Sequence, residues 1–435
     1  MEKRKLAVIG AGSAYTPEII DEIIRRQARL HISEIALVDI PEGRERAEII
    51  RDMALRMLRR EGVDCRVSLT MDRREALPGC RFVISQIRVG GWQARAEDER
   101  IGLSLGLIGQ ETTGCGGFMN AMRTVPEALA ICRDMEEICP EALLLNFTNP
   151  SGIVTEAVLR YSAVRAIGLC NCPINMHTDA AAALGLGREQ LQCRFGGLNH
   201  LSFMLSARTQ ERDVYDELIS RLRHDPTTMK NIPKVAGTDR LIPALGLIPS
   251  PYLQYFYFEP EMLEKELREL AEDGTTRGEQ VEKINRELFR IYACEDTDEK
   301  PAQLSQRGGS LYSYAAMDIL EASLSEEPRE LTVNTLNQGA IAGLADDAGV
   351  EVTCRVSRGG VERIPLGALP PQVAGLVAQV KRYESLTVDA AVCGSRRLAM
   401  QALLNHPLIH GFSNAEKVLQ AMEKRDRCPM RWKEE

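Results

Sequence analysis

Residues 6–18 read LAVIGAGSAYTPE, and this stretch decides the fold that we expect for the chain. The apolar run from Leu6 to Ile9 is typical of a strand buried on both faces, and a glycine turn follows it directly. Thr16 and Pro17 then suit the N-cap and the first position of a helix. A strand, a glycine turn and a helix in this order predict the first unit of a doubly wound α/β sheet, with an anion-binding helix N-terminus.

The same turn predicts a dinucleotide site. Gly10 and Gly12 allow a tight turn and a close approach of backbone N–H groups to a pyrophosphate, and Ser13 lies beside them. Tyr15 stands where the usual G-x-G-x-x-G pattern has its third glycine. Asp39 closes the next apolar run, where a carboxylate can accept hydrogen bonds from a ribose 2′-hydroxyl. We therefore expect the two glycines, Ser13 and Asp39 to bind NAD rather than NADP, with an ordinary strand–turn–helix as the alternative.

Short apolar runs and amphipathic segments alternate along the first half of the chain. Strands are predicted at residues 35–38, 66–70, 81–87, 142–147 and 166–169, and helices at 17–30, 44–60, 124–138 and 153–161. Strands that alternate with helices are typical of a parallel sheet covered on both faces. The expected fold class is therefore α/β, with an N-terminal Rossmann-like doubly wound parallel sheet.

The pattern changes after about residue 195. Strands are predicted at 198–208, 332–334 and 351–356, and helices at 259–292, 312–323, 371–385 and 398–404. This mixture predicts a C-terminal α+β domain. A chain of this length is too long for one typical domain. We expect an NAD-binding domain over residues 1–195 and an α+β domain for substrate binding and oligomerisation over residues 196–435, closely packed with the active site between them.

The composition restricts the partners and the location of the protein. The 435 residues carry a formal net charge of −8, which disfavours nucleic acid and anionic membranes. The first apolar run is too short for a signal peptide, and no stretch reaches the length of a membrane span, so we expect a cytoplasmic protein. The twelve cysteines are scattered without a C-x-x-C pair, which indicates reduced, mostly buried thiols.

Residues 85–120 read SQIRVGGWQARAEDERIGLSLGLIGQETTGCGGFMN, which is polar and glycine-rich for a core segment. Its polar side chains, among them Arg95 and Glu111, lie near glycines that let a backbone approach a ligand. The segment follows the fourth predicted strand, and loops at the carboxyl ends of strands bind ligands in α/β folds. We therefore expect a ligand-binding loop, with a solvated surface loop as the alternative. Glu111 is a candidate for handling protons, or a solvated carboxylate.

Polar residues also follow the next two predicted strands. Asn149 lies in NFTNP, which suits sugar hydroxyls or a nicotinamide ribose, although Asn-Pro also opens turns. Cys170 follows the sixth strand, and His200 follows a pair of glycines. A thiolate and an imidazole from two strand ends can share a metal ion whose other ligands are substrate oxygens. By composition alone, a buried cysteine and a core histidine remain the simpler interpretation.

Taken together, these motifs resemble glycoside hydrolase family 4, an NAD-dependent exception to glycoside hydrolysis by two carboxylates. The resemblance spans nearly the whole chain and depends on the order of the matches. The matching stretches are GAGSAYTPE (10–18), FVISQIRVGG (82–91), GLIGQETTGCGGF (106–118), NFTNPSGIVTEAV (146–158), IGLCNCPINM (167–176), GGLNHLS (196–202), PSPYLQYF (249–256), QRGGSLYS (306–313) and NHPLIHG (405–411).

The resemblance implies a metal bound by Cys170 and His200, usually Mn²⁺, whereas the softness of these two ligands alone favours zinc or iron. It implies that Tyr252, the first tyrosine of PSPYLQYF, is the catalytic base, with Tyr255 as the alternative. Asn171 stands where α-specific members carry an aspartate that serves as the acid. Asparagine cannot donate a proton in that way, so the β-specific, 6-phosphoglucoside branch is favoured.

The resemblance also implies substrate contacts and a partner. Asn149 and Arg307 match positions that contact substrate, and Arg95 is a further candidate. The sequence leaves open which of Arg88, Arg95 and Arg123 binds a 6-phosphate and which forms ion pairs. The expected partner is a small-molecule glycoside or phosphoglycoside, and family members form homodimers or homotetramers.

The implied reaction borrows a hydride from the sugar. NAD⁺ oxidises C3, the metal polarises the ketone, and Tyr252, its pKa lowered by the metal and its neighbours, removes the proton from C2. The aglycone leaves by elimination, water adds, and NADH returns the hydride. Unphosphorylated or α-linked glycosides are alternative substrates.

Two other classes of protein remain open at this point. The first is a dehydrogenase of the lactate/malate type, which needs a histidine base held by an aspartate; His200 follows an asparagine instead. The second is a non-catalytic NAD-binding or redox-sensing protein, which does not account for polar residues at three strand ends.

Overall fold

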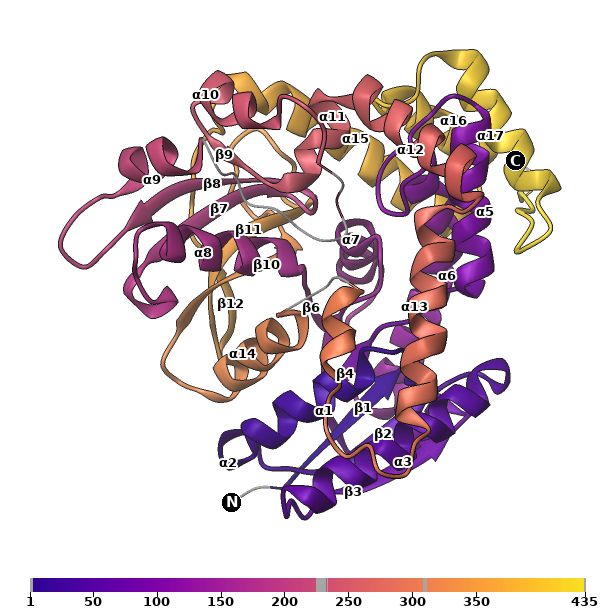
Figure 1. The fold of residues 1–435 in the computed structure, drawn as a ribbon, viewed down its shortest axis with the longest axis vertical. Coiled ribbons are helices and arrows are strands. Elements are labelled where there is room, and N and C mark those ends of the chain that lie inside the picture. Colours follow the sequence, from indigo (N-terminus) through magenta and orange to yellow (C-terminus); the bar gives the residue numbers. More distant parts are fainter. Residues whose placement is uncertain (1–2, 224–231, 233, 308–310, 434–435) are drawn as a thin grey trace.

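A computed structural model describes residues 3–223, 232, 234–307 and 311–433 (Figure 1). A nine-stranded sheet lies at its centre, in the order β12-β11-β10-β6-β5-β4-β1-β2-β3. Six of its strands are parallel and match the strands predicted for the first half of the chain, which confirms the doubly wound α/β fold. These are β1 (Arg4–Ile9), β2 (Ile32–Val38), β3 (Arg66–Thr70), β4 (Cys80–Ser85), β5 (Leu143–Asn146) and β6 (Arg165–Gly168).

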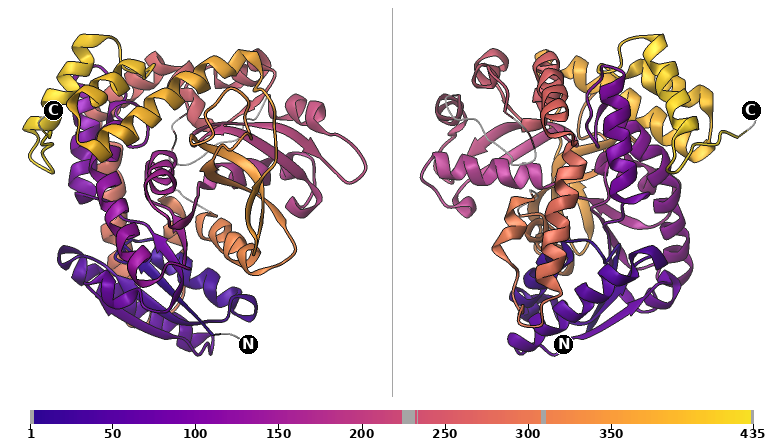
Figure 2. Two further views of the ribbon diagram at one scale, coloured as in Figure 1. Left: turned by 180° about the vertical axis from the view of Figure 1, so that it is seen from behind. Right: turned by 45° about the vertical axis from the view of Figure 1, so that its right-hand side comes forward.

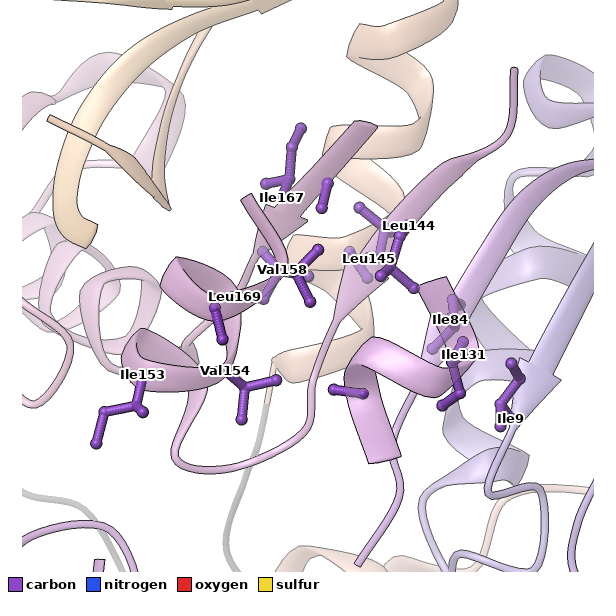
Figure 3. Packing of buried hydrophobic residues seen from close by; sticks show 14 of the residues in the cluster. Ile9, Ile84, Ile131, Leu144, Leu145, Ile153, Val154, Val158, Ile167 and Leu169 are labelled. Atoms are coloured by element: carbon purple, nitrogen blue, oxygen red, sulfur yellow. The ribbon is translucent and has the colours of Figure 1, made fainter. Parts of the chain in front are cut away.

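Helices cover the parallel strands, and the amphipathic ones do so with their apolar faces. In α3 (Arg44–Arg60), for example, the buried residues recur every three or four positions, and the other face is charged. Figure 3 shows how Ile84, Leu145 and Val158 pack in the core between strands and helices. The other helices of this half are α1 (Thr16–Arg25), α2 (Gln27–Leu30), α4 (Arg73–Ala76), α5 (Gly91–Ser104), α6 (Gly114–Ile138), α7 (Ser151–Tyr161) and α8 (Asn171–Ala183).

The second half of the chain extends this sheet and adds a smaller one. Strands β10 (Arg329–Leu336), β11 (Gly349–Ser357) and β12 (Gly360–Arg363) are antiparallel, and β10 joins β6 through the pair Asn334–Gly168. The smaller antiparallel sheet comprises β7 (Gln192–Leu198), β8 (Leu201–Arg208) and β9 (Ile248–Pro249) and lies beside α8 and α9 in Figure 1. The division at residue 195 therefore stays a proposal, because strands of both halves share one sheet.

Some of the remaining helices lie against the sheets, whereas the C-terminal ones, drawn in yellow, lie beside other helices at one end of the molecule, as the two views of Figure 2 show. They are α9 (Tyr215–Leu222), α10 (Leu241–Leu245), α11 (Gln254–Tyr257), α12 (Glu259–Asp273), α13 (Arg277–Tyr292), α14 (Tyr312–Leu324), α15 (Pro371–Cys393), α16 (Arg396–Asn405) and α17 (Phe412–Lys424). Short 3₁₀ turns are η1 (Pro41–Gly43), η2 (Arg188–Gln190), η3 (Thr238–Arg240), η4 (Pro251–Leu253) and η5 (Ala302–Gln306). Within the described ranges, no helix has the length and the apolar character that crossing a bilayer requires.

Several predictions of secondary structure were wrong in detail; the helix predicted at 17–30, for example, is divided into α1 and α2 at Arg26. Residues 85–120 are not one loop, because α5 and the start of α6 occupy most of them. The segment 259–292 is two helices: Gly274, at φ +67°, ends α12, and a capping box formed by Thr276 and Glu279 begins α13. The strand predicted at 198–208 is the second half of a hairpin, and Asn199 and His200 form the turn between β7 and β8.

Candidate active site

A cavity of about 440 Å³ opens at the carboxyl ends of β4, β5 and β6. This is the edge at which doubly wound sheets bind ligands, and the volume lies in the range of small-molecule sites. The structure brings together there most of the residues that the sequence pointed to. They are Arg88, Arg95, Glu111, Asn149, Cys170, Asn171, His200, Tyr252, Tyr255 and Arg307.

Cys170 and His200 reach the cavity from different sheets. Cys170 is the N-cap of α8, and its sulfur accepts a hydrogen bond from the Cys172 N–H at 3.3 Å. His200 lies in the β7–β8 turn in a left-handed conformation, with φ +64°. Both side chains are buried and line the same cavity, as a shared metal requires. Among the described residues, no third histidine, cysteine or carboxylate completes a metal-binding group, so further ligands would come from substrate or water.

The protonation of this pair fits a divalent cation. Burial lowers the pKa of His200 to about 3, so its imidazole is neutral at pH 7 and keeps a lone pair for a metal. Burial, and then the nearby Glu351, raises the pKa of the Cys170 thiol well above its usual range. A thiol in this position keeps its proton until a cation binds beside it, and metal coordination deprotonates thiols outright.

Tyr252 is stacked on His200. Their ring centroids lie 3.6 Å apart and the ring planes differ by 5°. Burial raises the pKa of Tyr252 well above its usual value, and Cys170 and Cys172 act in the same direction. The prediction that the neighbours of Tyr252 lower its pKa is therefore wrong. Tyr255 is also buried in the cavity wall, with its ring centroid 6.2 Å from that of Tyr252.

Glu111 lies between two arginines and is not a solvated carboxylate. Arg88 forms a short ion pair with one of its oxygens, and Arg95 Nη1 lies 2.9 Å from the other. Burial alone would raise the pKa of Glu111, but the two arginines lower it to about 2. Arg95 also donates to Glu99 at 2.8 Å through its Nε. Glu111 is therefore ionised at neutral pH and orients the two guanidinium groups.

Arg307 is the least satisfied cation of the cavity. Its guanidinium lies over the Tyr15 ring, 4.1 Å from the centroid, and 5.3 Å from the centroid of Trp92. The Nε and Nη1 atoms are buried and have no hydrogen-bond partner among the described residues. Burial lowers the pKa of Arg307, and the charges of Arg88 and Arg95 lower it further. Buried donors without partners in a positive environment are suited to an anion.

Arg123, another candidate for binding phosphate, lies outside this cavity lining. Its Nη2 is 2.6 Å from Asp98, and its Nε donates to the carbonyl oxygen of Val89. Arg425 contacts the same carboxylate at 2.9 Å. Asp98 is fully buried, so these contacts form a structural ion-pair cluster that ties α5 to the C-terminal segment.

The glycine turn lies next to Asp39, as a dinucleotide site requires. The Gly12 N–H donates to one carboxylate oxygen of Asp39 at 2.6 Å, and the Ile40 N–H donates to the other at 2.9 Å. Gly10 has φ +86°, and a Cβ there would lie 2.9 Å from the carbonyl oxygen of Gln86. The turn is thus a tight backbone cradle beside a fixed carboxylate, which fits NAD. Ser13 belongs to the same turn and its hydroxyl accepts from the Tyr15 N–H at 3.3 Å.

The two asparagines approach the cavity from strand ends. Asn149 follows β5 and precedes Pro150 through a cis peptide bond, and Asn171 is the first residue of α8. Asn149 lines the same cavity as Cys170 and His200, apart from the glycine turn. Its side chain is therefore placed to contact a ligand that lies in this cavity beside Cys170 and His200.

Sequence reasoning missed two aromatic residues of the cavity. Trp92 lies on α5 and contacts Arg88, Arg95 and Arg307, with distances of 4.3 to 5.3 Å from guanidinium carbon to ring centroid. Tyr312 donates from its hydroxyl to the carbonyl oxygen of Leu169 at 2.9 Å. The stretches that contain them, GGWQAR and GGSLYS, combine glycines with one aromatic residue, and that combination could have indicated a ligand wall.

Two family models match the chain in consecutive segments. The model of "Family 4 glycosyl hydrolase" matches residues 5–186, and the model of "Family 4 glycosyl hydrolase C-terminal domain" matches residues 195–409. Together they include every cavity residue named above.

Known proteins resemble the chain over nearly its whole length. "Probable 6-phospho-beta-glucosidase" of Bacillus subtilis (strain 168) is 42% identical, with 96% of this chain and 95% of the relative covered. The 6-phospho-beta-glucosidase of Escherichia coli (strain K12) is 37% identical, with 97% and 95% covered. The structure of the Thermotoga maritima 6-phospho-beta glucosidase with NAD and glucose-6-phosphate has a TM-score of 0.90 at 33% identity and covers 99% of this chain and 100% of that one. A second structure of that enzyme, with manganese, NAD⁺ and glucose-6-phosphate, has a TM-score of 0.88 at 32% identity, with the same coverage.

Proposed function

The chain belongs to family 4 of the glycosyl hydrolases, and from this membership we propose that it cleaves 6-phospho-β-glucosides with NAD⁺ and Mn²⁺ as cofactors. Relatives named for this substrate class are 35–42% identical to the chain, whereas those named for 6-phospho-α-glucosides are about 28% identical. The cavity carries the proposal, because it combines the Cys170–His200 pair with guanidinium nitrogens of Arg307 that have no partner among the described residues. A lactate/malate-type dehydrogenase is not supported, because both family models are those of a glycosyl hydrolase.

The 6-phosphate binds to Arg307 in this proposal. Its two buried nitrogens have no partner among the described residues, and a phosphate dianion would satisfy both. Arg88 and Arg95 share the charge of Glu111 and keep the region positive. The rings of Tyr15 and Trp92 lie 4.1 and 5.3 Å from the guanidinium carbon and restrict this side chain, so that little side-chain entropy is lost when the anion binds.

The sugar ring then lies between Arg307 and the Cys170–His200 pair, with Asn149 beside it. When bound, NAD⁺ and the metal supply reversible oxidation at C3 and polarisation of the resulting carbonyl, which makes the C2 proton acidic. Cys170 and His200 would hold the metal from one side and leave positions for sugar oxygens. Gly10, Gly12, Ser13 and Asp39 would hold the adenosine and pyrophosphate of NAD.

Tyr252 is the proposed base that takes the C2 proton on its hydroxyl oxygen. Its ring is stacked on His200, next to the proposed metal position, so its hydroxyl is the one whose pKa a bound cation can lower. Tyr255 is placed differently: burial raises its pKa, and the charges next in importance are those of Glu266 and Glu99 rather than the Cys170 thiol. Asn171 would orient the glycosidic oxygen or a water molecule by hydrogen bonding, without donating a proton.

A panel of p-nitrophenyl α- and β-glucosides, with and without a 6-phosphate, tests this proposal. The assays contain NAD⁺, Mn²⁺ and a thiol reductant. We expect only the 6-phospho-β-glucoside to be turned over well, without net NADH and with deuterium at C2 of the sugar formed in heavy water. Full activity in EDTA without NAD⁺ would contradict the proposal, and so would a product without deuterium. Turnover of the unphosphorylated or α-linked substrate at a comparable rate would change the proposed specificity.

Two conservative variants identify the base. Tyr252→Phe keeps the ring stacked on His200 and removes only the hydroxyl, so we expect kcat to fall by about 10²–10⁴-fold, together with the exchange at C2. Tyr255→Phe makes the same chemical change 6.2 Å away, and we expect less than about a tenfold loss. If Tyr255→Phe were the more damaging change, the assignment would move to Tyr255.

We also propose a cytoplasmic homodimer or homotetramer. All twelve cysteines are unpaired, which supports a reducing compartment. The oligomeric proposal rests on family membership, and large apolar side chains such as Leu404 and Phe412 are exposed on neighbouring helices. Light scattering of the purified protein at several concentrations measures the oligomeric state, and a monomer at all concentrations would contradict it.

A further inference from the structure

Gln110 makes three hydrogen bonds through a single oxygen in the turn that precedes α6. Its Oε1 lies 2.5 Å from the backbone nitrogen of Thr112, 2.9 Å from that of Thr113 and 2.8 Å from the hydroxyl of Thr112. Backbone N–H groups can only donate, so the side-chain atom that faces them has to be the amide oxygen. The orientation of the Gln110 amide is therefore fixed by two main-chain donors.

The hydroxyl of Thr112 is thereby committed as a donor to Gln110. The same hydroxyl oxygen lies 2.8 Å from Nδ1 of His200. Since its single proton points to Gln110, the oxygen can only accept from the imidazole. The proton of the neutral ring then sits on Nδ1, and Nε2 carries the lone pair.

We infer that Gln110 and Thr112 are positioning residues that hold His200 in the tautomer with a protonated Nδ1, which leaves Nε2 free to bind a divalent cation. A histidine that ligates a metal is commonly oriented by a hydrogen bond at its other ring nitrogen, and loss of that partner costs about 10–100-fold in metal affinity. In this protein the hydrogen-bond partner of Nδ1 is the neutral hydroxyl of Thr112. Gln110 sets the direction of that hydroxyl by accepting its proton. The metal-binding part of this inference rests on the proposed function, whereas the tautomer does not.

Two glycines of α6 allow the helix to pack closely against the turn that contains Gln110 and Thr112. Gly116 and Gly117 belong to the first turn of α6 and lie directly against the backbone of Gln110 and Thr112. A Cβ on Gly116 would collide with the carbonyl oxygen of Gln110, and one on Gly117 would lie 2.5 Å from the carbonyl carbon of Thr112. This contact explains the glycine pair of GQETTGCGG. Tyr252 supports the imidazole from the ring face, so the ring is fixed both in plane and in rotation.

Nitrogen-15 NMR of the metal-free protein tests the tautomer directly. Long-range ¹H–¹⁵N correlations distinguish protonated from unprotonated ring nitrogens, and His200→Gln assigns the signal among six histidines. We expect Nδ1 of His200 to be protonated and Nε2 unprotonated in the wild type. Thr112→Val keeps the shape of the side chain and removes the oxygen, so the proton should move wholly or partly to Nε2. Thr112→Ser and Gln110→Glu both retain the acceptors and should keep the wild-type tautomer.

Titration with Mn²⁺ alone, followed by loss of the EPR signal of the free ion, gives the second readout. We expect Thr112→Val to raise the Kd for Mn²⁺ by about 10–100-fold and Thr112→Ser to restore it to within about threefold of the wild type. Thr113→Val is the matched control, because the hydroxyl of Thr113 faces His406 at 3.4 Å, and it should change neither readout.

The outcomes separate this inference from the proposed function. A wild-type His200 with its proton on Nε2 overturns the inference, as does Thr112→Val with an unchanged tautomer and Kd. If the wild type binds no Mn²⁺, or if His200→Gln binds it equally well, the proposed metal site is wrong. The tautomer measurement still decides the inference in that case. A Thr112→Val protein that does not fold leaves the decision to the wild-type spectrum and to Thr112→Ser.

Discussion

The environment of Arg307 indicates an anionic ligand, because two of its buried nitrogens have no protein partner among the described residues. We predict that Arg307→Ala lowers kcat/KM for the 6-phospho-β-glucoside by about 10²–10³-fold, because a buried charged pair is worth about 3–4 kcal/mol. The low turnover of the unphosphorylated glucoside should change by less than about threefold. Arg59→Ala, at an exposed position of α3, is the control. Equal losses on both substrates would contradict a role in binding phosphate.

His406 makes the fold sensitive to acid. Burial lowers its pKa to about 3, and the N–H groups of Gly114 and Leu408 face its two ring nitrogens at 3.1 and 3.0 Å. The unfolded chain binds a proton at this residue below pH 6.5, and the folded chain does not until about pH 3. The free energy of unfolding therefore falls as the pH drops through this window, by about 1.4 kcal/mol per pH unit.

We predict that His406→Gln removes this contribution. The variant is less stable at neutral pH, since a buried ring is lost, so the informative quantity is the difference between pH 7 and pH 5. That difference should be about 2 kcal/mol smaller than in the wild type, as measured by urea unfolding. An unchanged difference would show that His406 is already protonated in the folded protein at pH 5.

The sequence indicated residues at strand ends more reliably than it indicated their partners. Cys170, His200 and Asn149 could be chosen because each follows an apolar run or a glycine pair. The pairing of Glu111 with Arg88 and Arg95 could not, because it depends on how α5 is placed against the loop after it. The pKa of Tyr252 was misjudged for the same reason: burial and neighbouring thiols are properties of the folded chain.

At the scale of elements, the start of α6 depends on residues without side chains. We predict that Gly117→Ala lowers the free energy of unfolding by about 2–4 kcal/mol, since its methyl group would be pressed against the backbone of Thr112. The measurement is chemical unfolding of the metal-free protein.

Gly375→Ala is the matched control for this change. Gly375 lies exposed within α15, and a Cβ there would meet no atom within 4 Å. Alanine should stabilise this helix by about 0.4–1 kcal/mol. If the two substitutions had similar effects, close packing at Gly117 would not be the cause.

The elements that the sequence predicted well were those with a clear apolar period. The bounds of α3 and β3 match the prediction: the buried residues of α3 follow one face, and the apolar residues Val67 and Leu69 of β3 alternate with polar ones. In contrast, α5 buries polar residues such as Arg95, Asp98 and Glu99 in ion pairs, so its composition imitates a loop. The hairpin at His200 was missed because Gly196 and Gly197 look like the end of a segment, yet they belong to β7.

At the scale of the whole molecule, the proposed metal joins two sheets. Cys170 follows β6 of the large sheet, and His200 belongs to the hairpin of the small one. A metal bound by both stabilises the folded state by about 2.7 kcal/mol at one hundred times its Kd. We predict that EDTA lowers the Tm by a few degrees and that Mn²⁺ restores it, as measured by calorimetry at constant NAD⁺.

The control for this prediction is His200→Gln, whose Tm should not respond to Mn²⁺. A wild-type Tm that is equal in EDTA and in excess Mn²⁺ would argue against a metal held between the two sheets.

The sequence did not predict that strands from the second half of the chain join the large sheet. The strands at 332–334 and 351–356 were predicted, but the pattern of a short apolar strand does not state which sheet it joins. Their position is set by the contacts of α7 with β10 and of α15 with α6, which are made between distant parts of the chain. The two proposed domains thus share one hydrophobic core.

Gly168 is the position where a substitution would most directly disturb the sheet that the two halves of the chain share. It pairs with Asn334 across the junction of the parallel and antiparallel strands, and a Cβ there would strike the hydroxyl of Thr155 and lie 2.9 Å from the Cβ of Asn334. A random-mutagenesis screen for loss of activity should therefore recover substitutions of a glycine that is absent from the cavity lining. Position 168 would then tolerate substitution as poorly as the proposed catalytic residues do, because the sheet would no longer pack and not because the chemistry is affected.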